Sequence, residues 1–533
     1  MVIRKTILPL VLLLVAVTTA AAPAFPCWQW LRARSGELVE VMLVGDEYMH
    51  YFLTRDSLRM QYDEQGLLVP LREQDYADMQ HRATLRKHSN LKSQTSNLKS
   101  QIYCGTRRQL VLLASFSDLT FKEEQPVLLW DNIFNQENFT MPPFHGSVHD
   151  YFYAQSYGQF NLQFDLYHVT LAKPHGDYRS IGTDDSNAGL LLMDLLTAMK
   201  NEVADWSVYD WDGDGYVEQV LMLFAGQAQN DGGDSQTIWS HQWSLTGQDR
   251  EPYAVTDANG TYYVDNYGCF PELSGRKDYG SFGTLCHEYG HCLGLPDFYY
   301  GTRKVVGTWD VMDYGNYNDG GFCPVGYSAH ERMVLGWLDV TELTEPAAIT
   351  DLKPLSQNQQ AYMIRNDGYA NEYYIIENRQ PTGWDSSLPG SGVLIFHIDY
   401  DEEIWRTASP NTNREKRYTI FPANNNTTDY SGWAYPYEQN DSLTNLSVPA
   451  AMLTHLNADD NYYMNHPIYN ISITDGTASF DFMGDSPSSI LSPLVSPHST
   501  HSAIYDLQGH FMGSSFYLLP KGIYVVNGKL IIK

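Results

Sequence analysis

Two histidines and a glutamate stand at helical spacing in the segment His287-Glu288-Tyr289-Gly290-His291-Cys292-Leu293-Gly294-Leu295-Pro296-Asp297. Residues four apart lie on the same face of an α-helix, so His287 and His291 can offer two imidazole nitrogens to one metal ion. Glu288 stands beside them, where a carboxylate can take a proton from a metal-activated water and pass it to a leaving amine. The segment therefore predicts a zinc helix that carries its own general base.

The residues after the second histidine predict a sharp turn. Gly294 permits the positive φ that ends a helix, and Pro296 prevents the helix from resuming. Asp297 can then return to the metal as a third ligand, although an aspartate after a helix end can also simply cap local amides. If Asp297 is not the ligand, the reserve candidates are His241 and the pair His397 and Asp399.

A second motif follows the zinc helix. The segment Gly307-Thr308-Trp309-Asp310-Val311-Met312-Asp313-Tyr314-Gly315 lies where metzincin proteases carry the tight turn that places a methionine under the zinc. Met312 would be that methionine. The Met-x-Tyr order also resembles metzincins in which the tyrosine supports the developing oxyanion, which makes Tyr314 a candidate for that role. The alternative is that both are ordinary core residues.

With these motifs, the chain resembles the M6-family metalloproteases, the immune inhibitor A group, from about Arg107 to about Met483. The matching motifs lie on both sides of the zinc helix and are Gly146–Phe152, Ser156–Gln159, Trp211–Val217, Pro324–Ala329, Leu335–Leu338 and Leu388–Ile395. The resemblance implies an α/β (α+β) metzincin-like zinc protease domain that acts on proteins or peptides.

The N-terminus predicts export. Arg4 and Lys5 precede an apolar run from Ile7 to Val17, and Ala22-Pro23-Ala24 offers a small-x-small cleavage pattern. Residues 1–24 are therefore interpreted as a signal peptide, too short to span a membrane. No later stretch is long and apolar enough to span one, so we expect a secreted, extracellular chain.

A basic, repetitive stretch follows a small N-terminal module. No acidic residue occurs between Asp78 and Asp118, and the hexapeptide Ser89–Gln94 is repeated as Ser96–Gln101. Such a segment is typical of an exposed linker. Short strands are expected within Leu38–Leu53 and Leu67–Val69. Residues 25–105 are accordingly interpreted as a propeptide that is cleaved off in the linker.

Composition limits the remaining classes of function. The chain has 533 residues, of which 43% are hydrophobic and 13% aromatic, and this suits a large globular core. A formal charge of −29 argues against a nucleic-acid partner, because phosphate binding needs a basic surface. Six cysteines in an exported chain could form up to three disulfides. Cys286 and Cys292 point to different sides of the zinc helix and should not pair.

The catalytic region, residues 106–345, has a mixed α/β pattern. A continuous apolar run predicts a buried strand at Leu110–Phe116, and helical or alternating patterns cover the segments that follow it. These segments are a helix at Val148–Gln155, a strand at Phe160–Val169, a helix at Asn187–Glu202 and a strand at Val220–Ala225.

A second candidate metal site lies within this region. Carboxylates alternate around glycines in a segment that resembles the first half of an EF-hand calcium loop. Its candidate ligands are Asp210, Asp212, Asp214, Tyr216 and Glu218. The twelfth position is Leu221 instead of glutamate, so Glu218 would have to supply the missing oxygen. The alternative is a solvated acidic turn.

The C-terminal part changes to strand-like segments separated by Asn, Gly and Asp turns. Residues 346–483 are interpreted as a β-sandwich-like module and residues 484–502 as a Ser/Pro-rich linker. The last segment, residues 503–533, resembles the C-terminal sorting domain of the type IX (Por) secretion system. That resemblance implies contact with the secretion machinery and attachment to the outer-membrane surface. The alternative is a small β-hairpin tail.

These observations favour a secreted zinc metalloendopeptidase with a structural calcium ion. Two other readings stay open. One is a surface binding or adhesion protein whose metals are only structural, and the other is a zinc amidase or esterase that acts on small molecules.

Overall fold

The computed structural model describes a subset of the residues. They are 22–46, 49–63, 65–80, 103–181, 185–199, 201–275, 279–301, 303–406, 410–412, 414–484, 504–505, 511–513, 523–526 and 529–532. The chain forms two compact units, Met1–Phe482 and Met483–Lys533. Most of the predicted signal peptide, the tandem repeat and nearly all of the predicted linker at 484–502 lie outside the described residues.

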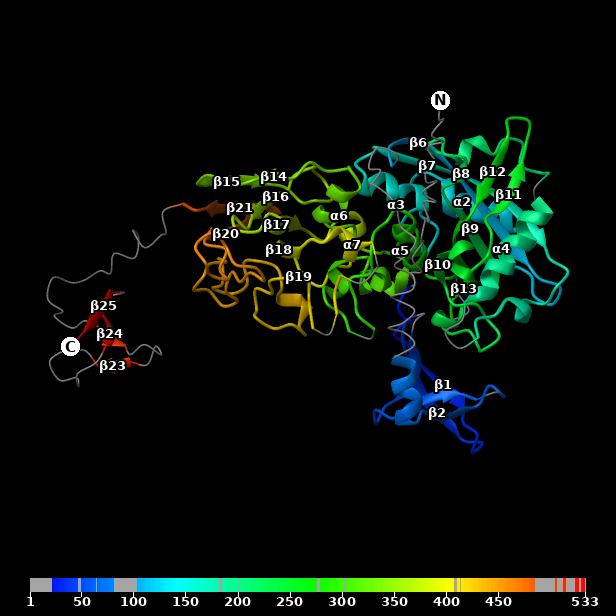
Figure 1. The fold of residues 1–533 in the computed structure, drawn as a ribbon, viewed down its shortest axis with the longest axis horizontal. Helices are drawn as coiled ribbons and strands as arrows, with labels where there is room; N and C mark the ends of the chain where they lie inside the picture. The colour runs from blue at the N-terminus through cyan, green and yellow to red at the C-terminus, as the bar shows by residue number, and fades with distance from the viewer. Residues whose placement is uncertain are drawn as a thin grey trace, which may run out of the picture. The chain divides into compact units, whose positions relative to one another are not determined.

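The N-terminal module is one antiparallel sheet in the order β1-β2-β3-β4-β5. Its strands are β1 (Trp28–Arg32), β2 (Leu38–Gly45), β3 (His50–Thr54), β4 (Arg59–Tyr62) and β5 (Leu68–Pro70) (Figure 1). The apolar side chains of one face, among them Val41, Leu43 and Phe52, form a small core. Trp239, which lies far along the chain, completes this core and is fully buried.

A five-stranded sheet supports the zinc-helix region. Its order is β10-β13-β9-β6-β7. All pairs are parallel except that of the edge strand β10 with β13. The strands are β6 (Gly105–Ser115), β7 (Phe160–Thr170), β9 (Val220–Gln227), β10 (His241–Ser244) and β13 (Asn266–Leu273). The apolar runs of β6 and β9 are buried throughout, as expected for central strands covered on both faces.

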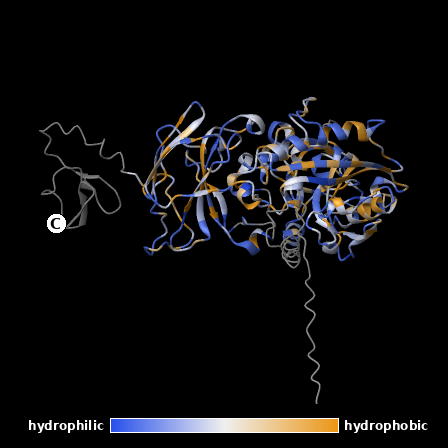
Figure 2. Cartoon of the chain, turned by 90° about the horizontal axis from the view of Figure 1, so that it is seen from above, coloured by the Kyte–Doolittle hydropathy of each residue, from blue (hydrophilic) through white to orange (hydrophobic). Residues whose placement is uncertain are grey.

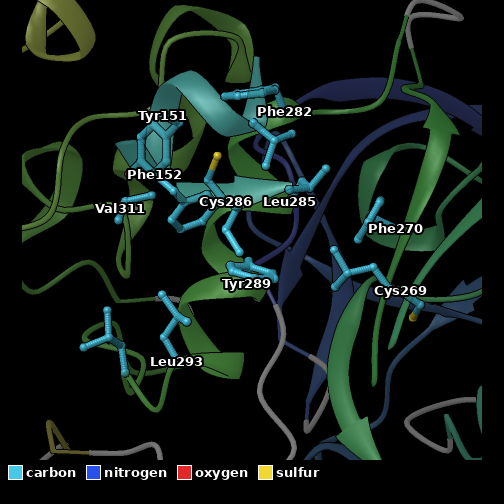
Figure 3. Close-up of a cluster of buried hydrophobic side chains, with 14 of the residues drawn as sticks. Tyr151, Phe152, Cys269, Phe270, Phe282, Leu285, Cys286, Tyr289, Leu293 and Val311 are labelled. Carbon is cyan, nitrogen blue, oxygen red and sulfur yellow. The ribbon is translucent and has the colours of Figure 1, made fainter. Parts of the chain in front are cut away.

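Helices flank this sheet and include the predicted zinc helix. They are α2 (Pro126–Asn135), α3 (Val148–Gln155), α4 (Ser186–Met199) and α5 (Phe282–Cys292). A smaller sheet contains β8 (Tyr216–Val217), β11 (Tyr253–Thr256) and β12 (Thr261–Val264). Ser281 caps α5 by accepting the amide of Thr284 at 3.2 Å. Tyr151 and Phe152 of α3 pack with Leu285 and Tyr289 in the core around α5 (Figure 3).

The C-terminal part of the first unit is rich in strands. One sheet has the order β14-β16-β17-β18-β19 and another β15-β21-β20. The first consists of β14 (Thr341–Glu342), β16 (Tyr362–Arg365), β17 (Glu372–Arg379), β18 (Gly392–Asp399) and β19 (Tyr418–Ile420). The second consists of β15 (Ala347–Leu352), β20 (Ile468–Thr474) and β21 (Thr477–Phe482). Two short helices, α6 (Ala329–Val334) and α7 (Glu402–Trp405), accompany them.

The core runs without a break from the α/β region into this β-rich region. One cluster of buried side chains contains Leu112 of β6, Leu285 of α5 and Phe396 of β18. Hydrophobic residues are interspersed along the helices and strands of both regions (Figure 2). The change of pattern after about residue 345 therefore does not mark a break in the core.

The second unit contains the predicted sorting-like segment. Its described strands, β22 (Ile504–Tyr505), β23 (Phe511–Gly513), β24 (Ile523–Val526) and β25 (Lys529–Ile532), form a sheet in the order β23-β22-β24-β25. Among the described residues of the whole chain, no helix has the length and apolar character to cross a membrane.

Candidate metal centre and active site

The two histidines of α5 are oriented by backbone carbonyl groups. Nδ1 of His287 lies 2.8 Å from the carbonyl oxygen of Val311, and Nδ1 of His291 lies 2.7 Å from that of Leu295. Because a carbonyl oxygen only accepts, each Nδ1 carries the proton and each Nε2 keeps its lone pair. The two Nε2 atoms are 3.1 Å apart, so both lone pairs face the same point.

Asp297 reaches this point because the chain turns back after α5. Gly294 has a φ of +91°, as the sequence predicted, and the amide of Leu295 donates to the carbonyl of Gly290 at 3.0 Å. Oδ1 of Asp297 then lies 3.1 Å from Nε2 of His287 and 3.2 Å from Nε2 of His291. The structure thus brings the three predicted ligands together, all of them buried.

This donor set fits a zinc ion. Ligands of a tetrahedral zinc ion at about 2.0–2.1 Å lie about 3.3 Å from one another, close to the observed spacing. Since neither Nε2 carries a proton, Oδ1 of Asp297 has no hydrogen-bond donor among the described residues. A buried carboxylate oxygen without a donor is costly unless a cation meets it.

Glu288 lies beside the cluster and is 1% exposed. Its Oε1 accepts the backbone amide of Ala22, and Oε2 has no hydrogen-bond partner among the described residues. Burial raises the pKa of Glu288 well above its usual range, and the charge of Asp297 adds to this effect. The amides of Ala22 and Gln242 act in the opposite direction. A carboxylate with a raised pKa takes up a proton more readily than an exposed one.

Met312 lies directly beneath α5. A Cβ built on Gly290 would come within 2.6 Å of the Met312 sulfur, so a larger residue there would force the Met312 side chain to shift. The carbonyl of Met312 accepts the amide of Phe298 at 2.9 Å and ties the turn to the segment that carries Asp297. The turn that carries Met312 therefore lies beneath α5, the position that the sequence predicted for it.

Comparison with known proteins identifies this region. Residues 106–334 match the family model described as the immune inhibitor A peptidase M6, catalytic domain. This region is a peptidase M6 catalytic domain. The metal cluster, Glu288 and Met312 all fall within the matched residues.

Two relatives extend the match somewhat further. Immune inhibitor A of Bacillus thuringiensis subsp. alesti is 28% identical over 308 residues, which cover 48% of this chain and 44% of that protein. Pre-pro-metalloprotease PrtV of Vibrio cholerae is 24% identical over 323 residues, which cover 49% of this chain and 34% of that protein. The chain thus spans less than half the length of these relatives.

Tyr314 of the M6 domain is not seated against the cluster. Its ring packs edge-on against Tyr299 at 6.1 Å, and Tyr299 in turn stacks on His287 at 6.3 Å. Lys304 lies 4.4 Å from the centroid of the Tyr314 ring. The tyrosine predicted to support the oxyanion is therefore separated from His287 by another aromatic ring.

Tyr317 contacts the N-terminal segment that reaches Glu288, and no sequence motif pointed to it. Its hydroxyl donates to the carbonyl oxygen of Pro23, the residue that follows Ala22. Burial raises the pKa of Tyr317 well above its usual range, and the charge of Glu288 contributes to that shift. Tyr317 is thus a residue of this site that reasoning from the sequence missed.

The N-terminal segment 22–25 contacts several residues of the M6 domain near Glu288. Besides its contacts with Glu288 and Tyr317, the carbonyl of Ala22 accepts Nε1 of Trp239 at 3.4 Å. The amide of Phe25 donates to the carbonyl of Asn230 at 2.8 Å. The ring of Phe25 packs edge-on against Tyr317 at 5.0 Å. The N-terminal segment therefore lies next to Glu288, the predicted general base.

The acidic loop of the M6 domain brings together only part of its predicted ligand set. Carboxylate oxygens of Asp210, Asp212 and Glu218 lie within 4.8 Å of one another. Oδ1 of Asp214 instead accepts the amide of Tyr216 at 2.8 Å. The Tyr216 side chain packs on Tyr263, so this residue could offer only its carbonyl oxygen. Burial raises the pKa of Glu218 to about 8, and the charges of Asp210 and Asp214 add to the shift.

The reserve ligands have other partners. His241 lies 2.7 Å from the carbonyl of Trp239 and 3.0 Å from the Tyr267 hydroxyl. His397 pairs with Glu372 at 2.6 Å, and Asp399 pairs with Arg417 at 2.9 Å. None of the six cysteines, all of which lie in described residues, is joined in a disulfide.

Proposed function

We propose that this chain is a zinc-dependent endopeptidase of the metzincin type that hydrolyses peptide bonds of proteins. The observation that carries the proposal is the buried triangle of His287, His291 and Asp297 with Glu288 beside it. Relatives of the M6 domain that are named as proteases support it.

Different side chains of the protein would hold the metal and transfer the proton. The three ligands would hold zinc, which when bound supplies a Lewis acid that acidifies water and polarises a carbonyl group. Oε2 of Glu288 is available to take the proton of the attacking water and to deliver it to the leaving amine. Burial of Glu288 keeps bulk water from competing for that proton.

For the oxyanion, Tyr317 is better placed than Tyr314. Its hydroxyl already donates to the carbonyl of Pro23, next in sequence to the Ala22 amide that Glu288 accepts, whereas Tyr314 packs behind Tyr299. Tyr317→Phe should therefore lower kcat by about a hundredfold, and Tyr314→Phe should lower it much less. Steady-state kinetics of both variants decides between them, and a larger loss in Tyr314→Phe would restore the role predicted from the sequence.

Substrate class and metal dependence separate the proposal from its two rivals. We expect cleavage of casein that disappears with a zinc chelator and returns on adding zinc, with little turnover of small esters. A scaffold protein with structural metals would cleave neither substrate. A small-molecule amidase or esterase would favour the ester. The position of a base beside the ligands supports the protease, because a structural zinc site needs no base.

We propose that the acidic loop binds calcium through Asp210, Asp212 and Glu218, with oxygens of Asp214 and Tyr216 completing the set. Three converging carboxylates on a glycine-containing turn support this site. Calcium should raise the melting temperature of the wild type but not of Asp210→Asn. Asp205→Asn, a nearby carboxylate that bonds to Ser207, should respond as the wild type does. If calcium raised the melting temperature of all three proteins equally, the acidic loop would not be the calcium site.

We propose that residues 25–105 form a propeptide and that the chain is secreted as a latent enzyme. Segment 22–25 supports latency because it covers Glu288. Residues 22–24 belong to the predicted signal peptide, so this contact survives export only if signal cleavage precedes Ala22.

Limited proteolysis in the basic linker tests latency. Cutting within residues 81–102 and removing the N-terminal module should raise peptidase activity at least about tenfold, the equivalent of about 1.4 kcal/mol of inhibitory contact. N-terminal sequencing fixes where the secreted chain begins. Full activity of an uncut secreted chain that starts near Phe25 would contradict latency.

We propose further that the C-terminal unit is a sorting domain that carries the protein through the secretion machinery to the outer-membrane surface. The small sheet β22–β25 and the resemblance of its sequence support this role. Deleting residues 503–533 should leave the protein inside the cell envelope. Unchanged release of the truncated chain would contradict the proposal.

A further inference from the structure

One strand of the β-rich region, β19, contacts the segment that carries the third ligand. Tyr418, at the start of β19, is fully buried, and its ring stacks on Phe298 with centroids 3.6 Å apart and planes inclined by 12°. Phe298 directly follows Asp297. The ring of Tyr418 therefore supports the segment that supplies the third ligand.

The hydroxyl group of Tyr418 reaches the methionine turn. It donates to Oδ2 of Asp310 at 2.9 Å and lies 2.7 Å from Oγ of Ser328. The other carboxylate oxygen of Asp310, Oδ1, accepts the amide of Met312 at 2.8 Å. One buried carboxylate thus joins a strand of the β-rich region to the turn beneath the zinc helix.

That turn orients a metal ligand. The carbonyl of Val311, between Asp310 and Met312, accepts Nδ1 of His287 at 2.8 Å. Partners of this kind fix the tautomer and the ring orientation of a ligating histidine. A shift of the 310–312 backbone would therefore turn the His287 ring away from the other two ligands.

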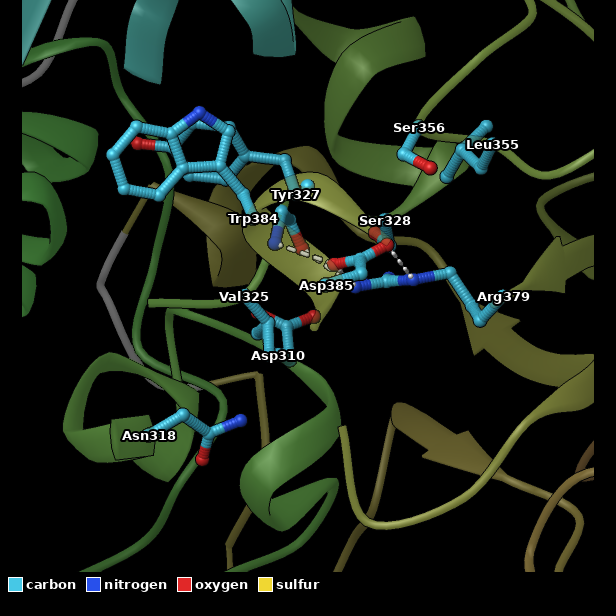
Figure 4. A network of polar contacts seen from close by, with 12 residues as sticks. Asp310, Asn318, Val325, Tyr327, Ser328, Leu355, Ser356, Arg379, Trp384 and Asp385 are labelled. Atoms are coloured by element: carbon cyan, nitrogen blue, oxygen red, sulfur yellow. Dashed lines mark hydrogen bonds and ion pairs between the residues drawn. The ribbon is translucent and has the colours of Figure 1, made fainter. Parts of the chain in front are cut away.

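A second buried residue, Asn411, also links the β-rich region to the segment that carries Asp297. Nδ2 of Asn411, which is fully buried, donates to the carbonyl of Phe298 at 2.8 Å and to that of Tyr418 at 3.0 Å. Asn411 lies outside the matched M6 domain, as Tyr418 does. Figure 4 shows Asp310 and Ser328 in the same polar layer as the Arg379–Asp385 ion pair, whose Nη2–Oδ1 distance is 2.7 Å.

We propose that Tyr418 is a positioning residue for the metal centre, so that the β-rich region is an integral part of the active site. Tyr418 touches neither metal nor substrate. It holds Asp297 through Phe298 and His287 through Asp310 and Val311. The proposal rests on the proposed zinc site and adds that the M6 domain does not hold its metal at full affinity without Tyr418.

Zinc affinity of the full-length apoprotein tests this directly. Tyr418→Phe keeps the stacked ring and removes only the hydroxyl. Competition with a chromophoric chelator should show zinc binding weakened by about ten- to a hundredfold, the range found for partners of metal ligands. Asp310→Asn keeps the size of the side chain but replaces one of the two oxygens that accept hydrogen bonds from Tyr418 and Met312 with an NH2 group. This variant should weaken zinc binding in the same range. In both variants kcat should fall while KM stays within about twofold of the wild type.

Tyr374→Phe is the matched control. The Tyr374 hydroxyl, on β17 of the same sheet, donates to the carbonyl of Met452 at 2.7 Å within the β-rich region. This variant should lose thermal stability comparably to Tyr418→Phe yet keep wild-type zinc affinity. Wild-type zinc affinity in Tyr418→Phe or in Asp310→Asn would overturn the proposal. If the wild type itself binds no zinc, the proposed function fails instead, so the two failures are distinguishable.

Discussion

Glu288→Gln should lose peptide cleavage by roughly a thousandfold, within the 10²- to 10⁴-fold range of general base catalysis. The amide keeps the size of the side chain and can still accept the Ala22 amide through its oxygen, but it cannot take a proton from water. Because Glu288 is not one of the three converging ligands, zinc content and melting temperature should stay close to those of the wild type. Casein hydrolysis, metal analysis and thermal unfolding measure these quantities.

The control for this variant is another buried glutamate. Glu272 of β13 is 2% exposed and accepts the amides of Lys122 at 2.7 Å and Gly226 at 3.2 Å. Glu272→Gln should cost stability without a comparable loss of kcat. Cleavage by Glu288→Gln at more than about a tenth of the wild-type rate would show that another group removes the proton.

Asp297→Asn should weaken zinc binding by more than about a hundredfold. Replacing a group that only orients a ligand costs ten- to a hundredfold, and a direct ligand should cost more. The substitution removes the charge that faces the two Nε2 atoms at 3.1 and 3.2 Å while keeping the shape of the side chain. Cleavage should fall in parallel and recover partly at high zinc concentration. Titration of the apoprotein with zinc gives the affinity.

Asp265→Asn provides the comparison. Asp265 is as buried as Asp297, but its oxygens accept the amide and the hydroxyl of Thr246 at 2.8 and 2.6 Å. Its replacement should leave zinc affinity unchanged. A zinc affinity of Asp297→Asn within about tenfold of the wild type would mean that the third ligand is a different residue.

The parts of this site that follow from local sequence could be predicted. Four-residue spacing placed His287 and His291 on one face, and the Gly294 turn returned Asp297 to them. The strands β6, β7 and β9 and the helices α3 and α4 follow from local periodicity, which reports which face of an element is buried. The M6 resemblance is confirmed over residues 106–334.

The parts that depend on distant segments could not be predicted. Ala22 and Glu288 are 266 residues apart, and Tyr418 and Asp310 are 108 apart. No periodicity encodes which of many tyrosines reaches a distant acceptor, so the hydrogen bonds of Tyr317 to Pro23 and of Tyr418 to Asp310 could not be predicted. Asp214 was expected among the converging carboxylates, but among the described residues of this loop only oxygens of Asp210, Asp212 and Glu218 lie within 4.8 Å of one another. A local motif shows which groups are available but not where they point.

Diffraction recorded across the zinc absorption edge, from crystals of the zinc-loaded protein, tests the central claim most directly. The predicted result is one anomalous peak at about 2.0–2.2 Å from Nε2 of His287, Nε2 of His291 and a carboxylate oxygen of Asp297. A peak elsewhere, or one that His287 and His291 hold without Asp297, would contradict the account.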